Sequence, residues 1–442
     1  SRYTLSGYVK DAATGEEIIG ATIVIRELPG TGAATNAYGY FAVTLPAGNY
    51  RAMAQAIGYQ SEERTIQLDK NQRVDFVLGT AESQLEEVVI SDVRRDENIV
   101  QTQMGIEKLD MKEIENIPVL MGEKDVLKTI QLRPGVKSAG EGNSGFYVRG
   151  GGADQNLILL DEATVYNASH LLGFFSVFNT DALKDVTLYK GSQPAVYGGR
   201  LSSVLDIRMQ DGNDKEYGAE GGIGLISSRL KIDGPIVKDK GSFTISGRRT
   251  YADLFLKLSP DSSINRARLY FYDLNAKANY RINDKNRIFL SGYFGKDVLG
   301  FGDNFGFDWG NATGTLRWNH LFSHRLFSNT SLIYSNYRYN IHIDMGALKG
   351  SILSRIQNYN LKQDFQYYAD HRHELKFGIN SIYHQIVPGG ITIETNDDIS
   401  KTEMPDNFGW ENAAYISHKW KFSEALNVEY GFRASSFSAI GP

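Results

Sequence analysis

From about residue 212 onward, apolar and polar side chains alternate along long segments of the chain. This period of two is typical of β-strands, whose successive side chains point to opposite faces. One such segment has Leu274, Ala276, Ala278, Tyr280 and Ile282 on one face, and Asn275, Lys277, Asn279 and Arg281 on the other. The same pattern recurs in residues 374–383 and 426–435. We expect these strands to form a wall that turns its apolar face to lipid and its polar face to a hydrated interior.

The connections between these strands are expected to alternate in length. Short ones are predicted at residues 234–240, 283–286, 323–325, 369–372 and 423–424. Long ones are predicted at residues 249–266, 296–308, 342–351 and 387–407. Short turns at one end and long loops at the other are typical of outer-membrane β-barrels. Residues 212–442 therefore predict about eleven antiparallel barrel strands, the first of them near residues 215–223.

Residues 1–79 show a different pattern, in which short apolar runs are separated by turn-forming residues. The runs are Leu5–Val9, Ala21–Ile25, Tyr40–Leu45, Tyr50–Ala56 and Val74–Leu78. Glycine, proline and asparagine lie between them, where turns are favoured. This regular spacing of short strands predicts a compact β-sandwich.

Residues 80–103 are rich in charge and contain one short apolar patch, Val88-Val89-Ile90. From composition alone this stretch is a linker in which the patch is incidental. Its position just before the next domain favours a second interpretation. In that interpretation Glu87, Val88, Val89, Ile90 and Ser91 form an extended peptide that pairs with the sheet edge of a partner.

Residues 104–211 mix helix and strand patterns. A short helix is expected at Asp125–Gln131, ended by Pro134-Gly135. Strand-like runs follow at Phe146–Arg149, Leu157–Asp161, Val186–Lys190 and Val204–Arg208. The pattern predicts a globular α/β domain between the linker and the wall.

Composition narrows the class of protein. Of the 442 residues, 41% are hydrophobic, 22% charged and 12% aromatic, which suits strands that face lipid with every second side chain. No apolar run reaches the roughly 18–20 residues that a membrane-spanning helix needs. The absence of cysteine excludes disulfides and cysteine-based metal sites or nucleophiles in this chain. A net charge of -5 gives no reason to expect nucleic acid.

Candidate catalytic and cofactor chemistry is sparse. The glycine clusters Gly150–Gly152 and Gly198-Gly199 are not followed by Lys-Ser/Thr, so neither predicts a phosphate-binding loop. Asp161-Glu162 is an acidic pair in a suggestive place, but neighbours on a strand face opposite sides and cannot act on one substrate. We therefore expect no catalysis, no cofactor and no bound metal.

Two stretches resemble known families. Residues 1–79, with SGYVKDAATGEEIIGATIVI and TNAYGYFAVTLPAGNYRAMAQAIGYQ, resemble the carboxypeptidase-regulatory-like (prealbumin-like) domain, a non-catalytic accessory. Residues 104–211 resemble the plug domain of TonB-dependent receptors through PGV, VRG, ILLDEATVY, VTLYKGSQPAVYGG and SVLDIRM, in the order and at the spacing of the family. The resemblance implies a mainly β protein with a prealbumin-like β-sandwich, an α/β plug and the N-terminal half of a 22-stranded transmembrane antiparallel β-barrel. Roughly half of the barrel would then lie outside this chain.

The resemblance also implies active transport of a scarce or large nutrient, such as an iron chelate, a vitamin, a glycan or a peptide, across the outer membrane of a Gram-negative bacterium. The inner-membrane protein TonB would pair with Glu87–Ser91 and supply the energy. The N-terminal domain would lie in the periplasm, and outer-membrane lipid would surround the wall. A surface lipoprotein lid and other outer-membrane subunits stay open as partners. The alternative is a scaffold subunit of a larger outer-membrane complex, which keeps the fold without transporting.

The family's plug motif falls here on Arg149, Gly150, Asp161, Lys190, Gly191, Tyr197, Gly198 and Arg200. We expect Arg149 and Arg200 to be buried and paired with acidic residues of the plug or wall, because an unpaired buried charge is costly. The alternative is that both lie in solvent. Ligand is expected between the plug apices and the barrel loops, at Glu141, Asn143, Tyr166, Asn167 and His170, near the aromatic residues Phe301, Phe305, Phe307 and Trp309. For His170, an ordinary surface or core position is the alternative.

Overall fold

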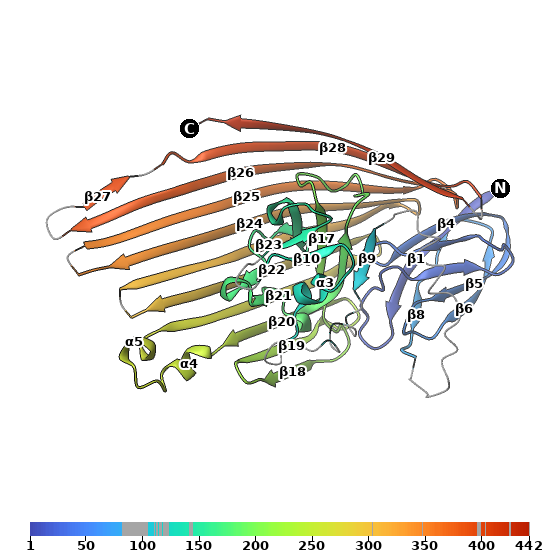
Figure 1. The fold of residues 1–442 in the computed structure, drawn as a ribbon. Coiled ribbons are helices and arrows are strands. Elements are labelled where there is room, and N and C mark those ends of the chain that lie inside the picture. Colours follow the sequence, from blue (N-terminus) through green and yellow to red (C-terminus); the bar gives the residue numbers. More distant parts are fainter. Residues whose placement is uncertain are drawn as a thin grey trace.

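The computed structural model describes residues 1–81, 105–109, 111, 114, 117, 123–140, 145–302, 304–346, 348–395, 399–402, 404–423 and 426–441. Three parts follow one another: an N-terminal domain (residues 1–81), a plug (the described residues of 105–211) and a wall (the described residues of 212–441). The plug lies against the concave face of the wall, and the N-terminal domain lies at one end of the wall strands (Figure 1).

The N-terminal domain is a two-sheet β-sandwich, as its apolar runs predict. Its strands are β1 (Arg2–Asp11), β2 (Thr22–Ile25), β3 (Gly32–Ala34), β4 (Tyr40–Pro46), β5 (Gly48–Gln55), β6 (Glu62–Leu68), β7 (Gln72–Arg73) and β8 (Phe76–Leu78). One sheet has the order β4-β1-β7, with β8 also paired to β1, and the other has the order β3-β2-β5-β6. Between them lies an apolar core that includes Leu5, Ile23, Phe41 and Phe76.

The plug is a mixed α/β domain around a sheet of order β13-β12-β17-β16-β9, in which β12 and β17 run parallel. Its strands are β9 (Ile106–Leu109), β10 (Val136–Ser138), β11 (Phe146–Val148), β12 (Asn156–Leu160), β13 (Ala163–Thr164), β14 (Ser169–His170), β15 (Phe175–Ser176), β16 (Leu183–Tyr189) and β17 (Ser203–Met209). Its helices are α3 (Val126–Gln131) and the 3-10 turns η2 (Ala153–Gln155), η3 (Leu171–Gly173) and η4 (Thr180–Ala182). The predicted helix is confirmed: α3 begins after Asp125, whose carboxylate accepts the Lys128 backbone N–H.

The wall is one antiparallel sheet that runs in order from β18 to β26 and on to β28 and β29, with β27 paired to β26. The strands are β18 (Gly218–Ile223), β19 (Ser227–Val237), β20 (Gly241–Thr250), β21 (Arg268–Asn283), β22 (Asn286–Phe301), β23 (Phe305–Ser323), β24 (Leu326–Asp344), β25 (Leu348–Tyr368), β26 (His373–Thr395), β27 (Ile399–Thr402), β28 (Asn407–Lys421) and β29 (Asn427–Ile440). Helices α4 (Ala252–Leu256) and α5 (Ser262–Asn265) lie between β20 and β21. The expected meander of about eleven strands is confirmed.

Side chains alternate across the wall in the predicted sense. On β21, Asn275, Lys277 and Asn279 are buried toward the plug, while Leu274 is exposed on the opposite face. A row of paired leucines continues that exposed face across four strands, formed by Leu290, Leu316, Leu332 and Leu361. The polar face of the wall is therefore the inner one, and its apolar face is turned outward.

Three of the expected long connections are wrong. Residues 296–308, 342–351 and 387–407 are largely strand, because β22, β24 and β26 continue to Phe301, Asp344 and Thr395. The β20–β21 connection does have the expected length. Strands of 16 to 23 residues exceed the roughly 9–11 residues that cross a bilayer. Past the lipid the outer face of a strand no longer needs to be apolar, so the alternation that marks a lipid-facing strand ends while backbone pairing continues.

None of the described helices is long and apolar enough to cross a membrane.

The outward leucine row gives a test of the side-chain alternation. We expect Leu290→Arg to destabilise the folded wall by about 2–4 kcal/mol, because an arginine would replace an exposed apolar side chain on the lipid face. The measurement is a denaturant titration of the protein in lipid vesicles. Leu290→Met, which keeps the volume and the apolar character, serves as control and should stay within about 1.5 kcal/mol of the parent. Equal stabilities of the Arg and Met variants would show that this face does not meet lipid.

Candidate functional site: the interface between plug and wall

The turn between β12 and β13 carries the acidic pair Asp161-Glu162 into the wall. Both residues have positive φ angles, 46° and 74°, a backbone conformation that residues other than glycine rarely adopt. Both side chains are charged and nearly inaccessible to solvent. The sequence pattern suggested that the pair lies on a strand, but it lies in a turn. Its two carboxylates contact different wall residues. Strain of this kind persists where surrounding contacts hold it in place.

Glu162 is the most heavily contacted carboxylate of this interface. Its oxygens accept hydrogen bonds from Ser331 Oγ at 2.5 Å and Asn329 Nδ2 at 3.2 Å. Arg317 and Lys362 add ion pairs at 3.4 and 3.6 Å. Burial opposes ionisation of Glu162, but these two cations outweigh it and hold the pKa of its carboxyl well below the usual range. Glu162 is therefore an anion fixed between four wall residues.

Asp161 is held by the neighbouring part of the wall. Its carboxylate lies 3.3 Å from Lys277 Nζ and accepts the Met209 backbone N–H at 3.1 Å. Its own carbonyl accepts a hydrogen bond from Thr315 Oγ1 at 2.9 Å. Lys277 also pairs at 2.8 Å with Asp211, where the plug leads into the wall. Wall cations thus compensate both acidic residues of the turn.

A second contact of opposite polarity surrounds His170, which is 1% exposed. Its two ring nitrogens lie 2.6 Å from Asp297 and 2.7 Å from Asp273, both on the wall. The ring stacks on Phe271 with 4.0 Å between centroids. Burial disfavours the imidazolium, yet the carboxylates of Asp273 and Asp297 raise the pKa of His170 to about 9. Here the plug supplies the cation and the wall the anions.

Arg248 and Tyr293 complete the cluster around His170. The Arg248 guanidinium donates to Asp273 at 2.6 and 2.9 Å and to the Ser176 carbonyl of the plug at 2.7 Å. The Tyr293 hydroxyl donates to Asp273 at 2.8 Å. His170, which was expected to bind ligand, therefore holds the plug against the wall. Both of its ring nitrogens are paired with wall carboxylates.

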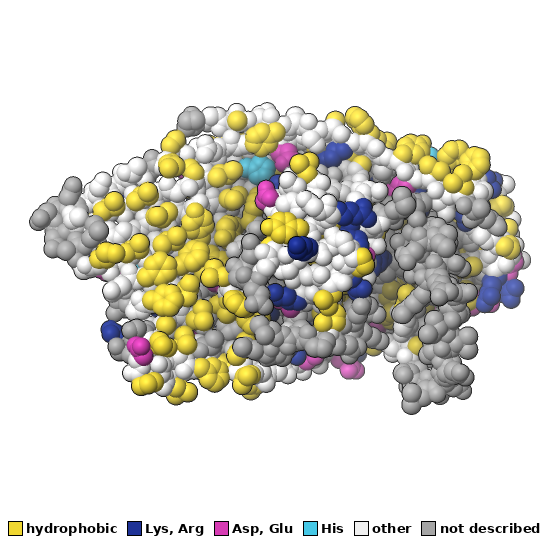
Figure 2. All heavy atoms as spheres, viewed as in Figure 1, with side chains coloured by type: hydrophobic (Ala, Val, Ile, Leu, Met, Phe, Trp, Pro, Cys, Tyr) yellow, Lys and Arg dark blue, Asp and Glu magenta, His cyan; other side chains and the backbone are white. Residues whose placement is uncertain are grey.

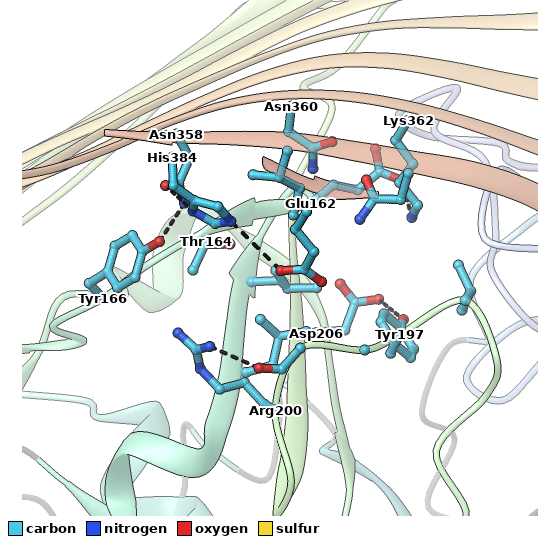
Figure 3. A pocket seen from close by; sticks show the side chains of 18 of the residues that line it. Glu162, Thr164, Tyr166, Tyr197, Arg200, Asp206, Asn358, Asn360, Lys362 and His384 are labelled. Carbon is cyan, nitrogen blue, oxygen red and sulfur yellow. Dashed lines mark hydrogen bonds and ion pairs between the residues drawn. The ribbon is translucent and has the colours of Figure 1, made fainter. Parts of the chain in front are cut away.

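A small polar cavity of about 80 Å³ separates another part of the plug from β25, β26 and β28 (Figure 3). From the plug, Thr164, Tyr166, Arg200 and Asp206 line it. From the wall come Asn358, Asn360, Lys362, Asn380, His384 and Glu411. The Tyr166 hydroxyl is hydrogen-bonded to the Asn358 amide, whose oxygen lies 2.8 Å from His384 Nδ1. Glu162 also lines this cavity, so polar groups here face a space large enough for water, unlike the closely packed contact of His170.

The two arginines of the family motif do not fasten the plug to the wall, so this expectation is wrong. Arg149 is exposed and has a positive φ of 49°. Arg200 is half-buried beside the cavity, where its guanidinium donates to the Gly199 carbonyl at 2.9 Å. The fastening cations come from the wall instead, as Arg317, Lys277 and Lys362. The sequence marks each of these three only as a polar position of an alternating strand.

The remaining motif residues organise the plug, and one of them, Gly198, lies against the wall. Lys190 is buried, contacts Glu107 and donates to the Pro134 carbonyl at 2.9 Å, close to Gly191. The Tyr197 hydroxyl donates to Asp206 at 3.1 Å. A Cβ at Gly198 would collide with Arg433, whose guanidinium donates to the Ala195 and Val196 carbonyls at 3.2 Å. Gly150, with φ 84°, turns the chain after Arg149.

Two of the expected ligand residues, Asn167 and Tyr166, lie on the plug where it meets the wall. Asn311 Nδ2 donates to the Asn167 carbonyl at 2.7 Å, and the Asn167 amide lies 3.5 Å from the Tyr337 hydroxyl. Tyr166 borders the cavity. Glu141, Asn143 and the segment Glu87–Ser91 lie outside the described residues. Among the described residues no group of three or more His, Cys, Asp or Glu side chains is placed to hold a metal ion.

Two protein-family models match the N-terminal domain and the plug. Residues 5–90 match the model of the CarboxypepD_reg-like domain, and residues 99–203 match that of the TonB-dependent Receptor Plug Domain. No curated protein matches the sequence.

Solved structures share the fold at low sequence identity. The copper transporter OprC has a TM-score of 0.58 at 13% identity, over 76% of this chain and 55% of its own. The siderophore receptor PirA from Acinetobacter baumannii has 0.56 at 15%, over 79% and 58%, and the ferric citrate transporter FecA has 0.57 at 12%, over 78% and 58%. The chain thus spans somewhat more than half the length of these proteins. Its two family matches show a CarboxypepD_reg-like domain followed by a TonB-dependent receptor plug domain, and plug and wall together have the fold of the solved receptors and transporters named above.

Proposed function

We propose that the protein imports a nutrient across the outer membrane by TonB-dependent transport, with the plug as the gate of the lumen. The observation that carries this proposal is the pairing of plug and wall charges. Asp161, Glu162 and His170 are each compensated by inner residues of the wall. A plug fastened in this way closes the lumen until work is done on it. A protein that only binds a ligand, without controlling its passage, does not require a plug inside a lumen.

The energy for opening must arrive from the periplasm, because the outer membrane holds neither ATP nor an ion gradient. In this proposal TonB pairs with Glu87–Ser91 by β-strand addition and pulls on the plug. That segment lies between the N-terminal domain and the plug in sequence, so tension on it acts on both. The transporters named in two of the similar structures support this assignment at the level of fold.

The wall just beyond the plug indicates the chemistry of the cargo. Asn311 and Tyr337 touch the plug and are paired across β23 and β24. Because residues two apart share a face of the sheet, the next rows outward also line the lumen. These rows consist of Trp309 with Tyr339, and of Phe307 with Ile341 and Ile352. Figure 2 shows hydrophobic side chains gathered over the part of the concave face away from the N-terminal domain.

Trp309 adds a polar feature to this apolar surface. Its side chain is 3% exposed and packs against Phe307 with 4.5 Å between ring centroids. Among the described residues no acceptor lies within hydrogen-bond distance of its indole N–H. This N–H is itself inaccessible, so only the apolar surface of the rows is offered to a ligand. We propose a cargo with an apolar or aromatic surface, bound between these rows and the plug apices at Tyr166 and Asn167.

Deletion of Glu87–Ser91 separates transport from the scaffold alternative. The compounds that copurify with the full-length protein are identified by mass spectrometry, and their uptake is measured in cells with energised and de-energised inner membranes. We expect the deletion to abolish energised uptake while cargo binding stays unchanged, because the proposed binding surface contains no residue of the linker. A deletion of the same length at residues 92–96 serves as control. Energised uptake that is unchanged both by the Glu87–Ser91 deletion and by removal of the whole protein would favour the scaffold.

The contact of His170 predicts that the fastening of the plug depends on pH. Its folded pKa of about 9 lies above the ordinary value of 6.5. A raised histidine pKa contributes stability that is fully present below pH 6.5 and lost as the pH rises through 9. The contribution is on the order of 3 kcal/mol. Thermal unfolding of the full-length protein should therefore show a loss of stability from pH 7 to 10, which His170→Asn lacks. Identical pH profiles of the two proteins would contradict this assignment.

A further inference from the structure

The N-terminal domain has a sheet that is buried on both faces. On β4, Phe41 and Val43 point into the core of the sandwich, as expected. The intervening side chains of Tyr40, Ala42 and Thr44 point the other way and are buried too, with Tyr40 at 0% exposure. The outer face of a sandwich sheet normally meets water. Here it is covered by the wall.

The covering surface is the end of the wall that carries the short turns (Figure 1). In the β23–β24 turn, His324 Nδ1 lies 2.8 Å from Ser6 Oγ, and Arg325 Nε donates to Thr4 Oγ1 at 2.8 Å. The Tyr40 hydroxyl donates to the His324 carbonyl at 2.8 Å. Its ring packs with Leu321, Phe327 and Tyr368 of the wall. In the next turn, β21–β22, Arg73 donates to the Asp284 carbonyl at 2.7 Å.

Buried charges are shared between the N-terminal domain and the other two parts. Glu17 is buried and pairs with Arg287 and, at 3.8 Å, with Arg281 of the wall. Glu16 lies 2.9 Å from Lys184 of the plug and accepts the Asp211 backbone N–H at 2.9 Å. Gly15 allows this approach, because a Cβ there would collide with Asp214. Removing one member of a buried ion pair is strongly destabilising, so these contacts favour one docked position.

Tyr38 of the N-terminal domain contacts both the plug and the wall. Two guanidinium groups lie over its ring: Arg208 of the plug is 5.6 Å and Arg317 of the wall 5.4 Å from the ring centroid. It also stacks on Phe327 at 5.4 Å. Its hydroxyl lies 3.3 Å from Glu162 Oε1, and Glu162 is the carboxylate that Arg317 and Lys362 hold.

From these contacts we propose that the N-terminal domain is a second element of the gate, which caps the short-turn end of the lumen and holds the plug in place through Tyr38 and Glu162. Its docking surface is the sheet face of β1 and β4 together with Glu16, Glu17 and Tyr38. The partner of that surface is the wall and plug of the same chain. Movement of the plug toward the short-turn end requires this domain to leave first. The order of events rests on the proposed function, whereas the docking does not.

A disulfide test examines the docking directly. The 442 residues contain no cysteine, so Ser6→Cys with His324→Cys introduces the one pair in this chain. In the full-length protein a protease site placed in residues 92–103 lets the N-terminal domain be cut from the plug. We expect the oxidised pair to keep the cut domain attached on a non-reducing gel. Thr65→Cys with His324→Cys is the matched control, since Thr65 is exposed on the opposite sheet. Equal cross-linking of the two pairs overturns the docking.

A second measurement tests the coupling to the plug without any cargo. Ala163→Cys, at 0% exposure beside Glu162, reports by its maleimide reactivity whether the turn has left the wall. Removing the hydroxyl with Tyr38→Phe should speed release of the cut domain and raise this reactivity. We expect a change of about 10- to 100-fold, because one hydrogen bond to a buried carboxylate is lost. The control is Tyr50→Phe, since the Tyr50 hydroxyl donates to the Pro46 carbonyl within the N-terminal domain. Unchanged release and reactivity in Tyr38→Phe overturn the proposal.

Uptake by the cross-linked protein then decides the order of events. We expect the oxidised Ser6→Cys/His324→Cys protein to bind cargo normally but to lose uptake, and reductant to restore it. Wild-type uptake by the cross-linked protein overturns the gating role. If the reduced protein and the parent both fail to take up cargo, the transport proposal fails. The cross-link and the Ala163→Cys reactivity still decide whether the domain holds the plug.

Discussion

The position of the plug depends on the compensation of charges that neither the plug nor the wall can satisfy alone. Asp161 and Glu162 would be buried and unpaired without Lys277, Arg317 and Lys362 of the wall. At the other contact the polarity is reversed, because cationic His170 enters a pair of wall carboxylates. Desolvation makes each unpaired charge cost several kcal/mol. Since a rotated or shifted plug would place like charges together, the two contacts of opposite polarity specify one seated arrangement, which apolar packing alone would not.

The backbone is strained at both contacts, that of Asp161-Glu162 and that of His170. Asp161 and Glu162 have positive φ, and so do Leu171 and Leu172 directly after His170. Each such residue costs on the order of 1–3 kcal/mol and persists only while its surroundings hold it. When the plug leaves the wall, this strain is released and water reaches the separated charges, and both effects offset part of the lost ion pairing. The polar cavity beside Tyr166 and Asn358 already holds room for that water. A plug fastened by charge can therefore be firmly seated and still be released by a directed pull.

Much of the fold, but less of the site, could be predicted from the sequence. Alternation in β21 or β29 is a local property of each strand, so the wall, its inner polar face and its strand number followed from it. The loop lengths at one end of the wall could not be predicted in this way, because strand pairing continues beyond the lipid, where the outer face is no longer apolar. Arg149 and Arg200 were expected to fasten the plug, yet the partners of Glu162 are Arg317 and Lys362. Which lumen-facing cation meets which plug carboxylate is decided by the register of strands far apart in sequence. The run Tyr40–Leu45 did indicate the docking of the N-terminal domain. Neither face of this strand carries a charged side chain, and such a strand of a two-sheet sandwich needs cover on both sides.

The shared contact at Glu162 gives a thermodynamic link between the domains that mere proximity would not. Its carboxylate accepts the Tyr38 hydroxyl of the N-terminal domain while Arg317 of the wall contacts both Glu162 and the Tyr38 ring. When the plug is unseated, Tyr38 loses its acceptor, and when the N-terminal domain leaves, Glu162 loses a donor while still buried. Such coupling is reciprocal, so whatever stabilises the docked domain stabilises the seated plug by the same free energy. In the proposed mechanism, tension on the linker between the two parts acts on both contacts at once, so a modest force opens a gate that would stay closed if only one contact were loaded.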